Sequence, residues 1–146
     1  MDKSGGCLCR AVRFDAINVP DTFSICHCEM CRRWTGSALL EVSIKTENLI
    51  WHGADNIAVH TSSDWAERAW CKSCGTNVYF RHTKKDKWFG STELPIGIFD
   101  DPNGFVLTHE IYADHKPDSF AYAGEGHKRL TRAEVLALNP DLEWDT

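Results

Sequence analysis

The chain reads Gly6-Cys7-Leu8-Cys9 near its start, then Cys26-His27-Cys28-Glu29-Met30-Cys31, and Cys71-Lys72-Ser73-Cys74-Gly75 at its middle. These three segments hold all seven cysteines of the 146 residues. That share is about 5%, below the roughly 8–10% typical of a small disulfide scaffold. The count is odd, and the spacings within each segment are short. This pattern predicts metal binding.

The cysteines divide into a set of four and a set of three. In an extended strand, residues two apart point to the same face, so each Cys-x-Cys pair can direct two thiolates at one metal. Cys71 and Cys74 form a knuckle around a tight turn, where Gly75 can take a positive φ. A structural zinc closes with four ligands, which two pairs supply together as the four-cysteine cluster: Cys7, Cys9, Cys71 and Cys74. The remaining three leave one coordination position open, as at a catalytic zinc, and form the three-cysteine cluster: Cys26, Cys28 and Cys31. The sequence therefore predicts two zinc ions per chain.

Other uses of the cysteines stay open or are disfavoured. A histidine could close the second site as its fourth ligand, and one or two cysteines could be reduced core residues. A redox dithiol at Cys71 and Cys74 is disfavoured because no βαβ pattern surrounds it. His27-Cys28-Glu29 matches the H-x-E of zinc nucleobase deaminases. However, Trp70 stands where their proline belongs, and that interpretation leaves four cysteines without a role.

The composition is that of a globular domain, with 42% hydrophobic and 25% charged residues. A net charge of −5 gives no basic field, so neither nucleic acid nor an anionic membrane is expected as a partner. No apolar run approaches the roughly 18 residues that span a bilayer, and the first residues lack a secretory signal. We therefore expect a cytoplasmic protein with reduced thiols. Residues 1–146 are expected to form a single zinc-binding domain, with its core at about 5–117 and a C-terminal cover at 118–146.

Short strands dominate the expected secondary structure, so the predicted fold class is mainly β with one or two short helices. Strands are expected at 11–14, 38–44, 49–51, 57–61, 77–81, 87–89 and 105–112. Residues 53–56 have the composition of a turn and are expected to join the strands on either side of them as a hairpin.

One short C-terminal helix is clearly signalled. Thr131 is its N-cap, and Glu134 stands three residues later as the partner in a capping box. Leu130 and Val135 are placed as a hydrophobic staple, and Asn139-Pro140 ends the helix. We expect this helix to cover the surface without chemistry of its own.

A zinc ion held by three thiolates favours one kind of chemistry. Its net charge of −1 makes it a weak Lewis acid, poorly suited to generating hydroxide from water. It can still accept a thiol as the fourth ligand, and a coordinating thiol loses its proton. The resulting thiolate stays nucleophilic in this electron-rich setting. The three-cysteine cluster therefore predicts transfer of a thiol to a carbon electrophile.

The sequence resembles the glutathione-dependent formaldehyde-activating (GFA) family, also called the centromere protein V/GFA domain. The resemblance runs from about Gly5 to about Pro117 and rests on the order and spacing of the cysteines. Other matching residues are Val12, Phe14, Arg32, Gly36-Ser37-Ala38, Ser62-Ser63, Arg68, Thr76, Gly97-Ile98-Phe99-Asp100-Asp101 and His109. Two positions depart from the family pattern: Arg10 stands where glycine is common, and Trp70 stands where phenylalanine is usual.

The resemblance implies a fold, two metal sites and an activity. The fold would consist of coiled, mostly antiparallel β-sheets around zinc, similar to that of methionine sulfoxide reductase B. The four-cysteine cluster would hold a structural zinc, and the three-cysteine cluster a labile catalytic zinc. The activity would be that of a carbon–sulfur lyase, which reversibly joins glutathione and formaldehyde as S-(hydroxymethyl)glutathione.

Four further side chains are candidates for roles in that activity. Addition of a thiolate to an aldehyde creates an alkoxide, and His27 or His109 could protonate it because histidine titrates near neutrality. Arg32 and Arg33 could bind a carboxylate of the thiol substrate. The plainer interpretation makes the histidines supporting or solvent-facing residues and the arginines ordinary surface charges.

Two functions of other classes compete with the enzyme. One is a non-catalytic zinc-binding interaction module, which the centromere protein V branch of the family suggests. The other is thiol redox sensing or zinc handling through the three-cysteine cluster. The only basic cluster, Lys84, Lys85 and Lys87, is most simply a solvated hairpin tip. The oligomeric state does not follow from the sequence.

Overall fold

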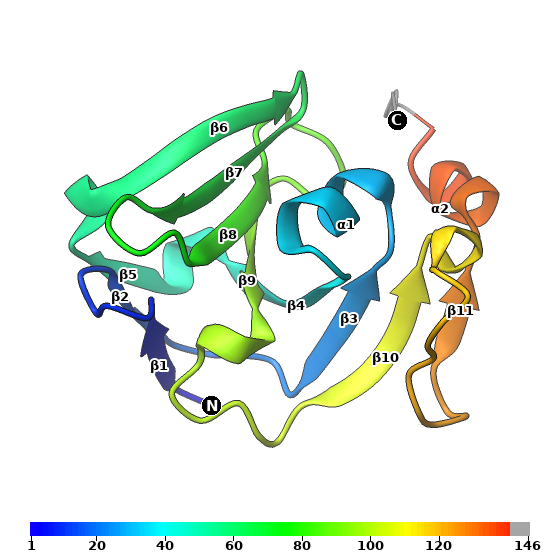
Figure 1. Ribbon diagram of the computed structural model, residues 1–146, viewed down its shortest axis with the longest axis horizontal. Helices are drawn as coiled ribbons and strands as arrows, with labels where there is room; N and C mark the ends of the chain where they lie inside the picture. Colours follow the sequence, from blue (N-terminus) through cyan, green and yellow to red (C-terminus); the bar gives the residue numbers. More distant parts are fainter. Residues whose placement is uncertain (141–146) are drawn as a thin grey trace.

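The computed structural model describes residues 1–140, which form two β-sheets and two short α-helices (Figure 1). The smaller sheet has the order β1-β2-β5: β1 (Lys3–Gly6), β2 (Arg13–Ala16) and β5 (Leu49–His52). The larger sheet has the order β11-β10-β3-β4-β9-β8-β7-β6: β11 (Lys128–Leu130), β10 (Val106–Ile111), β3 (Thr22–Cys26), β4 (Leu39–Lys45), β9 (Ser91–Pro95), β8 (Asn77–His82), β7 (Ala66–Cys71) and β6 (Ile57–Ser63). The helices are α1 (Glu29–Thr35) and α2 (Arg132–Leu138), and four 3-10 turns join strands: Thr46–Asn48, Ala54–Asn56, Ile96–Ile98 and Ala113–His115. The expectation of a mainly β fold with a short C-terminal helix is confirmed.

Most strand pairings are antiparallel, but β10 runs parallel to both of its neighbours, β3 and β11. The eight strands curve, and α1 lies inside the curve (Figure 1). The chain passes from the end of β3 directly into α1. The first residues of α1 therefore lie on the concave side of the larger sheet.

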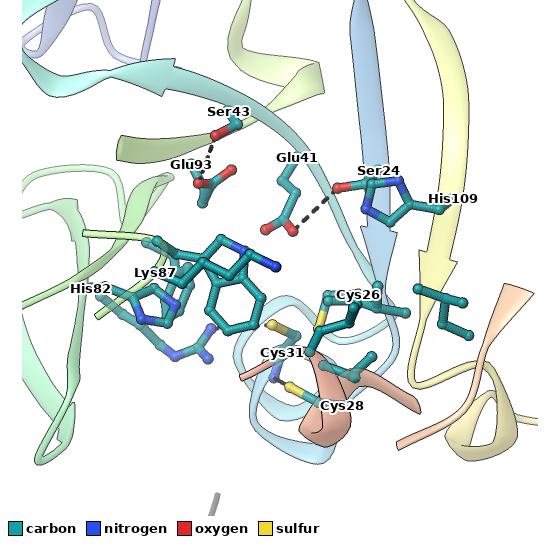
Figure 2. A pocket seen from close by; sticks show the side chains of 17 residues that line it. Ser24, Cys26, Cys28, Cys31, Glu41, Ser43, His82, Lys87, Glu93 and His109 are labelled. Carbon is teal, nitrogen blue, oxygen red and sulfur yellow. Dashed lines mark hydrogen bonds between the residues drawn. The ribbon is translucent and has the colours of Figure 1, made fainter. Parts of the chain in front are cut away.

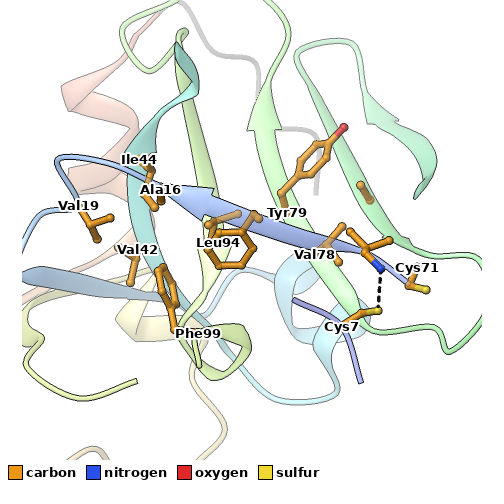
Figure 3. Packing of buried hydrophobic residues seen from close by; sticks show 13 residues of the cluster. Cys7, Ala16, Val19, Val42, Ile44, Cys71, Val78, Tyr79, Leu94 and Phe99 are labelled. Carbon is orange, nitrogen blue, oxygen red and sulfur yellow. Dashed lines mark hydrogen bonds between the residues drawn. The ribbon is translucent and has the colours of Figure 1, made fainter. Parts of the chain in front are cut away.

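Two clusters of buried side chains lie on opposite faces of the larger sheet. The first fills the space between the two sheets and includes Phe14 of β2, Val42 of β4 and Leu94 of β9 (Figure 3). The second lies around α1 and includes the three-cysteine cluster with Leu39 and Tyr112. Because side chains alternate along a strand, β4 supplies Val42 to the first cluster while its odd-numbered residues face the second.

The segment Cys26-His27-Cys28 is a strand-to-helix junction, where the sequence suggested a continuous strand. Strand β3 ends at Cys26, and Cys28 is the N-cap of α1, with its Sγ accepting a hydrogen bond from the Cys31 backbone N–H at 3.3 Å. Gly36 ends the helix in the left-handed conformation, at φ 81°. The proposed alternation of two thiolates along a strand is therefore wrong here, although the thiols do converge.

Two local predictions are corrected by the tertiary structure. The expected hairpin around residues 53–56 does not form, because β5 belongs to the smaller sheet and β6 to the larger one. Residues 87–89 form a turn, and the strand follows them as β9. The Asp86 carboxylate accepts a hydrogen bond from the Trp88 backbone N–H at 2.8 Å and contacts His82 at 2.8 Å, which holds the segment as a turn.

The C-terminal helix forms as predicted. Thr131 accepts a hydrogen bond from the Glu134 backbone N–H and completes the capping box, and Asn139 is the C-cap. Leu130 and Val135 both join the second cluster, so α2 closes one side of it. Among residues 1–140, no helix is long and apolar enough to cross a membrane.

Candidate metal centres and cavity

The four-cysteine cluster joins the turn after β1 to the end of β7 and the knuckle that follows it. Its four sulfur atoms lie within 4.8 Å of one another. Sγ of Cys9 is 3.6 Å from that of Cys7 and 3.7 Å from that of Cys71. A tetrahedron with metal–sulfur distances of about 2.3 Å has edges of about 3.8 Å, whereas a disulfide needs about 2.05 Å. These spacings therefore fit a closed tetrahedral zinc site.

Local hydrogen bonds stabilise thiolates in this cluster. The Val12 backbone N–H donates to Cys7 Sγ at 3.3 Å, and Asn56 Nδ2 donates to Cys71 Sγ at 3.3 Å. A hydrogen bond with the Thr76 hydroxyl, at 3.2 Å, is the largest of several contacts that lower the pKa of Cys74 to about 5. Thiolate is the form that binds metal, so the lowered pKa values of Cys71 and Cys74 favour the metal-binding form at these two ligands.

Both turns of the four-cysteine cluster use the left-handed conformation. Gly75 has φ 78°, and its N–H donates to the Cys71 carbonyl at 2.9 Å, which closes the knuckle. Arg10 has φ 68°, and its N–H donates to the Cys7 carbonyl at 3.1 Å. Arg10 thus replaces the glycine that is common in the family at a position whose backbone conformation favours glycine.

The three-cysteine cluster lies at the junction of β3 and α1. Its sulfur atoms also lie within 4.8 Å of one another, and Cys26, Cys28 and Cys31 are 4%, 1% and 2% exposed. Hydrogen bonds from the thiols of Cys26 and Cys31 lower the pKa of Cys28, so one thiolate is stabilised by its two neighbours. Three soft donors on one side of a shared space fit a zinc ion that keeps a fourth position open.

Arg68 of β7 supplies a positive charge to the three-cysteine cluster. It is buried, at 4% exposed, and its Nη1 donates to Cys31 Sγ at 3.5 Å. Its guanidinium also lies 4.6 Å from the ring centroid of Phe80 and 5.1 Å from that of Trp34. One guanidinium would neutralise the net −1 of a zinc ion with three thiolates. The sequence predicted no role for Arg68 beyond its match to the family pattern.

A cavity of about 280 Å³ opens beside the three-cysteine cluster (Figure 2). Apolar side chains form part of its wall: Phe80, Trp88, Ile111, Leu130, Val135 and Leu138. Polar and charged side chains form the rest: Ser24, Glu41, Ser43, Arg68, His82, Lys87, Glu93 and His109. The cavity therefore offers space for a small molecule next to the open side of the three thiols.

Two carboxylates in this cavity were not predicted from the sequence. Glu41 projects into it from β4 and Glu93 from β9 (Figure 2). Burial raises the pKa of Glu41 well above its usual range, and the charges of Glu93 and Cys28 raise it further. Burial also raises the pKa of Glu93 to about 7. For Glu41, the sequence signal of a buried carboxylate was its position within the largely apolar stretch 38–44.

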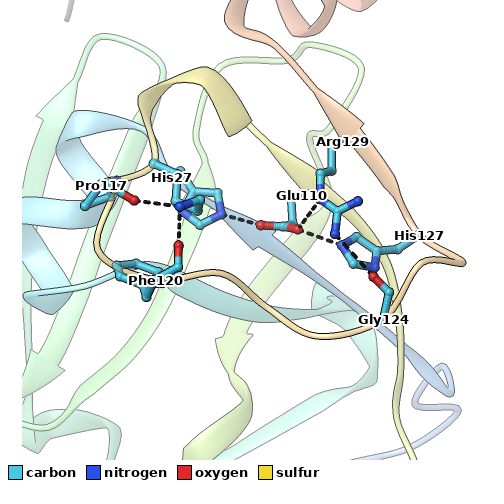
Figure 4. Close-up of polar contacts among 8 residues, drawn as sticks. His27, Glu110, Pro117, Phe120, Gly124, His127 and Arg129 are labelled. Atoms are coloured by element: carbon cyan, nitrogen blue, oxygen red, sulfur yellow. Dashed lines mark hydrogen bonds and ion pairs between the residues drawn. The ribbon is translucent and has the colours of Figure 1, made fainter.

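The two candidate histidines lie in different places. His109 lines the cavity, where burial lowers its pKa, with a smaller effect from Lys128. His27 is fully buried outside the residues that line the cavity, and its Nε2 lies 2.7 Å from Glu110 Oε1. Glu110 also contacts His127 at 2.6 Å, so His27 is part of a polar network that joins β10 to the C-terminal cover (Figure 4).

The two candidate arginines, Arg32 and Arg33, also lie outside the cavity. Both line a separate depression on the surface, together with Ser37 and Phe120. Nε of Arg33 forms an ion pair with Glu29 at 2.9 Å, one helical turn earlier in α1. The structure thus brings the three-cysteine cluster together with His109, and it separates them from His27 and the two arginines.

Three comparisons show which known proteins this chain is similar to. The family model described as glutathione-dependent formaldehyde-activating enzyme matches residues 2–115. A Schizosaccharomyces pombe protein named as an uncharacterized lyase is 34% identical over 125 residues, which cover 85% of this chain and 88% of that protein. The crystal structure of a Rhodobacter sphaeroides protein shares the fold, with a TM-score of 0.56 and 22% identity over 71% of this chain and 97% of that one. The chain therefore belongs to the glutathione-dependent formaldehyde-activating enzyme family.

Proposed function

We propose that this protein is a zinc-dependent carbon–sulfur lyase that forms and cleaves the S-hydroxymethyl adduct of a glutathione-like thiol and a formaldehyde-like aldehyde. The observation that carries the proposal is the placement of the three-cysteine cluster against a cavity. Membership of the family and the lyase name of the yeast relative support the reaction class.

Each metal site has a distinct part in this proposal. The four-cysteine cluster would hold a structural zinc, because four thiolates complete a tetrahedron and leave no position for substrate. The three-cysteine cluster would hold the second zinc, which supplies an open position where a substrate thiol loses its proton. Arg68, which is buried and also lines the cavity, would offset the negative charge of this second site.

The cavity residues would orient the aldehyde and exclude bulk water. Apolar walls favour a small, weakly polar electrophile over a charged one. Of the two histidines considered as general acid, only His109 faces this space. Its lowered pKa leaves it neutral at pH 7, so its imidazolium would be scarce as a proton donor. The role of Arg32 and Arg33 in binding a carboxylate stays a prediction, and would place that carboxylate outside the cavity.

Substitution of Cys28 tests the proposal directly. Exchange between glutathione, formaldehyde and their adduct is followed by NMR, and the uncatalysed rate is subtracted because thiols and formaldehyde combine unaided. We expect Cys28→Ser to lose all catalysed exchange while the fold survives, since the four-cysteine cluster is intact. Exchange at the wild-type rate in Cys28→Ser would refute the mechanism and favour a non-catalytic zinc-binding module.

A further inference from the structure

Two carboxylates and one hydroxyl share the face of the larger sheet that lines the cavity. In the antiparallel pairing of β4 and β9, Ser43 lies opposite Glu93 and Glu41 lies opposite Pro95. Glu41 and Glu93 are therefore diagonal neighbours on one face, at a spacing that long side chains can bridge. Figure 2 shows both carboxyl groups directed into the cavity.

The side-chain hydrogen bonds of these carboxylates, among the described residues, are made with hydroxyl groups. The Ser24 hydroxyl donates to Glu41 at 3.4 Å, and the Ser43 hydroxyl donates to Glu93 at 2.9 Å. Within residues 1–140, no ion pair joins either carboxylate to a lysine, arginine or histidine. Two neighbouring carboxyl groups in a partly desolvated site do not both ionise readily, so such a pair holds one proton between them.

Charged and titratable groups from every surrounding element face this pair across the cavity. They are Cys26 of β3, Cys28 and Cys31 at α1, Arg68 of β7, His82 of β8, Lys87 of the turn before β9, and His109 of β10. Thiolate charge at Cys28 favours the protonated form of Glu41, whereas Arg68 opposes it. Burial favours protonation at both glutamates.

We propose that Glu41 and Glu93 act as one catalytic pair that carries the reaction's proton between the substrate thiol and the aldehyde oxygen. This inference rests on the proposed function and adds to it the missing acid and base. In the forward direction, the pair accepts the thiol proton as the thiolate forms. The sulfur lone pair then forms the carbon–sulfur bond, and the carbonyl π electrons move to the oxygen. The pair passes the proton that it took from the thiol to this oxygen.

The reverse direction uses the same atoms. A carboxylate of the pair takes the hydroxyl proton, the carbon–oxygen double bond re-forms and the carbon–sulfur bond breaks. The sulfur leaves with its electrons and is then reprotonated by the pair. Proton and electrons balance in both directions, and no oxidant, reductant or further reactant is needed.

The burial of the two carboxylates fits such a relay. Glu41 is 9% exposed, Glu93 is half-buried, and Ser43 is exposed. We assign the more buried carboxylate, Glu41, to the exchange with the reacting oxygen. The less buried one, hydrogen-bonded to an exposed hydroxyl, can re-equilibrate with solvent between turnovers.

The test uses Glu41→Gln, Glu93→Gln and the double variant, because glutamine keeps the shape and the hydrogen bonds but cannot transfer a proton. The full-length zinc-loaded proteins are assayed for catalysed exchange across pH, with zinc content and melting temperature as checks. Glu47→Gln, at an exposed position outside the cavity, is the matched control. We expect Glu41→Gln and the double variant to lower the catalysed rate by about 100-fold or more, and Glu47→Gln to leave it unchanged.

A second readout does not depend on activity. Infrared difference spectra across pH should show a carbonyl stretch from a protonated carboxyl group near neutral pH in the wild type, which the double variant lacks. Wild-type exchange rates and an unchanged pH profile in the double variant would overturn the inference and leave the lyase proposal standing. Absence of catalysed exchange in the wild type would overturn both the lyase proposal and the carboxylate-pair inference. Loss of exchange in Cys28→Ser with full exchange in the double variant would overturn only the carboxylate-pair inference.

Discussion

The guanidinium of Arg68 donates a hydrogen bond to Sγ of Cys31 at 3.5 Å, and both side chains are almost completely buried. Desolvation of a guanidinium is unfavourable unless a negative partner lies close to it. Here the partner is a cluster of thiols whose metal-binding form is anionic. The arginine and the cysteines, 37 positions apart in the chain, therefore stabilise each other's charged states.

Replacement of Arg68 by methionine should weaken metal binding at the three-cysteine cluster. Methionine has a similar length and fills the space between Phe80 and Trp34, but it removes the charge and the cation–π contacts with both rings. Loss of a group that supports metal ligands lowers affinity by roughly 10–100-fold. Zinc release into a mild chelator should have two phases, a fast one from the three-cysteine cluster and a slow one from the four-cysteine cluster. In Arg68→Met the rate of the fast phase should increase and that of the slow phase should stay unchanged. Equal fast phases in the two proteins would show that the guanidinium does not support the metal.

Cys74→Ser and Cys28→Ser should differ in stability, although each removes one thiol. Loss of a ligand from a closed structural site removes metal-binding free energy from folding, which we expect to be about 3 kcal/mol or more. That corresponds to a fall in melting temperature of roughly 10 °C for Cys74→Ser. Cys28→Ser should shift the melting temperature much less, because its site already lacks one ligand. Calorimetry of both zinc-loaded variants measures the two melting temperatures. Similar shifts would contradict the assignment of a structural role to the four-cysteine cluster and a catalytic role to the three-cysteine cluster.

Arg10→Gly should stabilise the protein. Arg10 occupies the left-handed conformation at φ 68°, which costs about 1 kcal/mol for a residue with a Cβ. Glycine removes that strain but adds entropy to the unfolded chain, so we expect a net gain of about 0.5 kcal/mol. Chemical denaturation measures it. Arg33→Gly is the contrasting control, because glycine within α1 should destabilise the chain by about 1 kcal/mol; a loss of stability in Arg10→Gly would contradict the interpretation.

Glu110 should make the stability of the fold sensitive to acid. Burial alone would raise its pKa, but hydrogen bonds from His27 and His127 outweigh this and lower the pKa below its ordinary value of 4.5. Because the pKa of Glu110 is lower in the folded state than in the unfolded state, its carboxylate stabilises the folded state. This stabilisation is fully present at pH values above the ordinary pKa of glutamate. This stability is lost as the pH falls from about 4.5 through the lowered value.

Glu110→Gln removes this dependence together with the contacts to both histidines. We expect a loss of roughly 3 kcal/mol at neutral pH, because a buried charged network loses its anion. The variant should also show a flatter fall in stability below pH 4.5 than the wild type. Denaturation at several pH values measures both effects. Parallel pH curves for the two proteins would show that Glu110 is not the responsible group.

The sequence by itself determined the division of the cysteines, the mainly β class and the C-terminal helix. Each of these depends on short-range information: ligand spacing within a few residues, alternation along a strand, and the capping box of Thr131 and Glu134. Even where the local interpretation was wrong, as for the strand expected across Cys26 and Cys28, the spacing alone was enough to bring the thiols together.

Only the tertiary structure decided what surrounds the three-cysteine cluster. His27 is next to two of its cysteines in the chain, yet its side chain is held by Glu110 and lies outside the cavity. Glu41, Glu93 and Arg68 come from three strands that are distant in the chain, and the curve of the larger sheet carries them to one cavity. Their roles depend on burial and on charges contributed by other strands, and strand order in a sheet is set by long-range packing that no local pattern encodes.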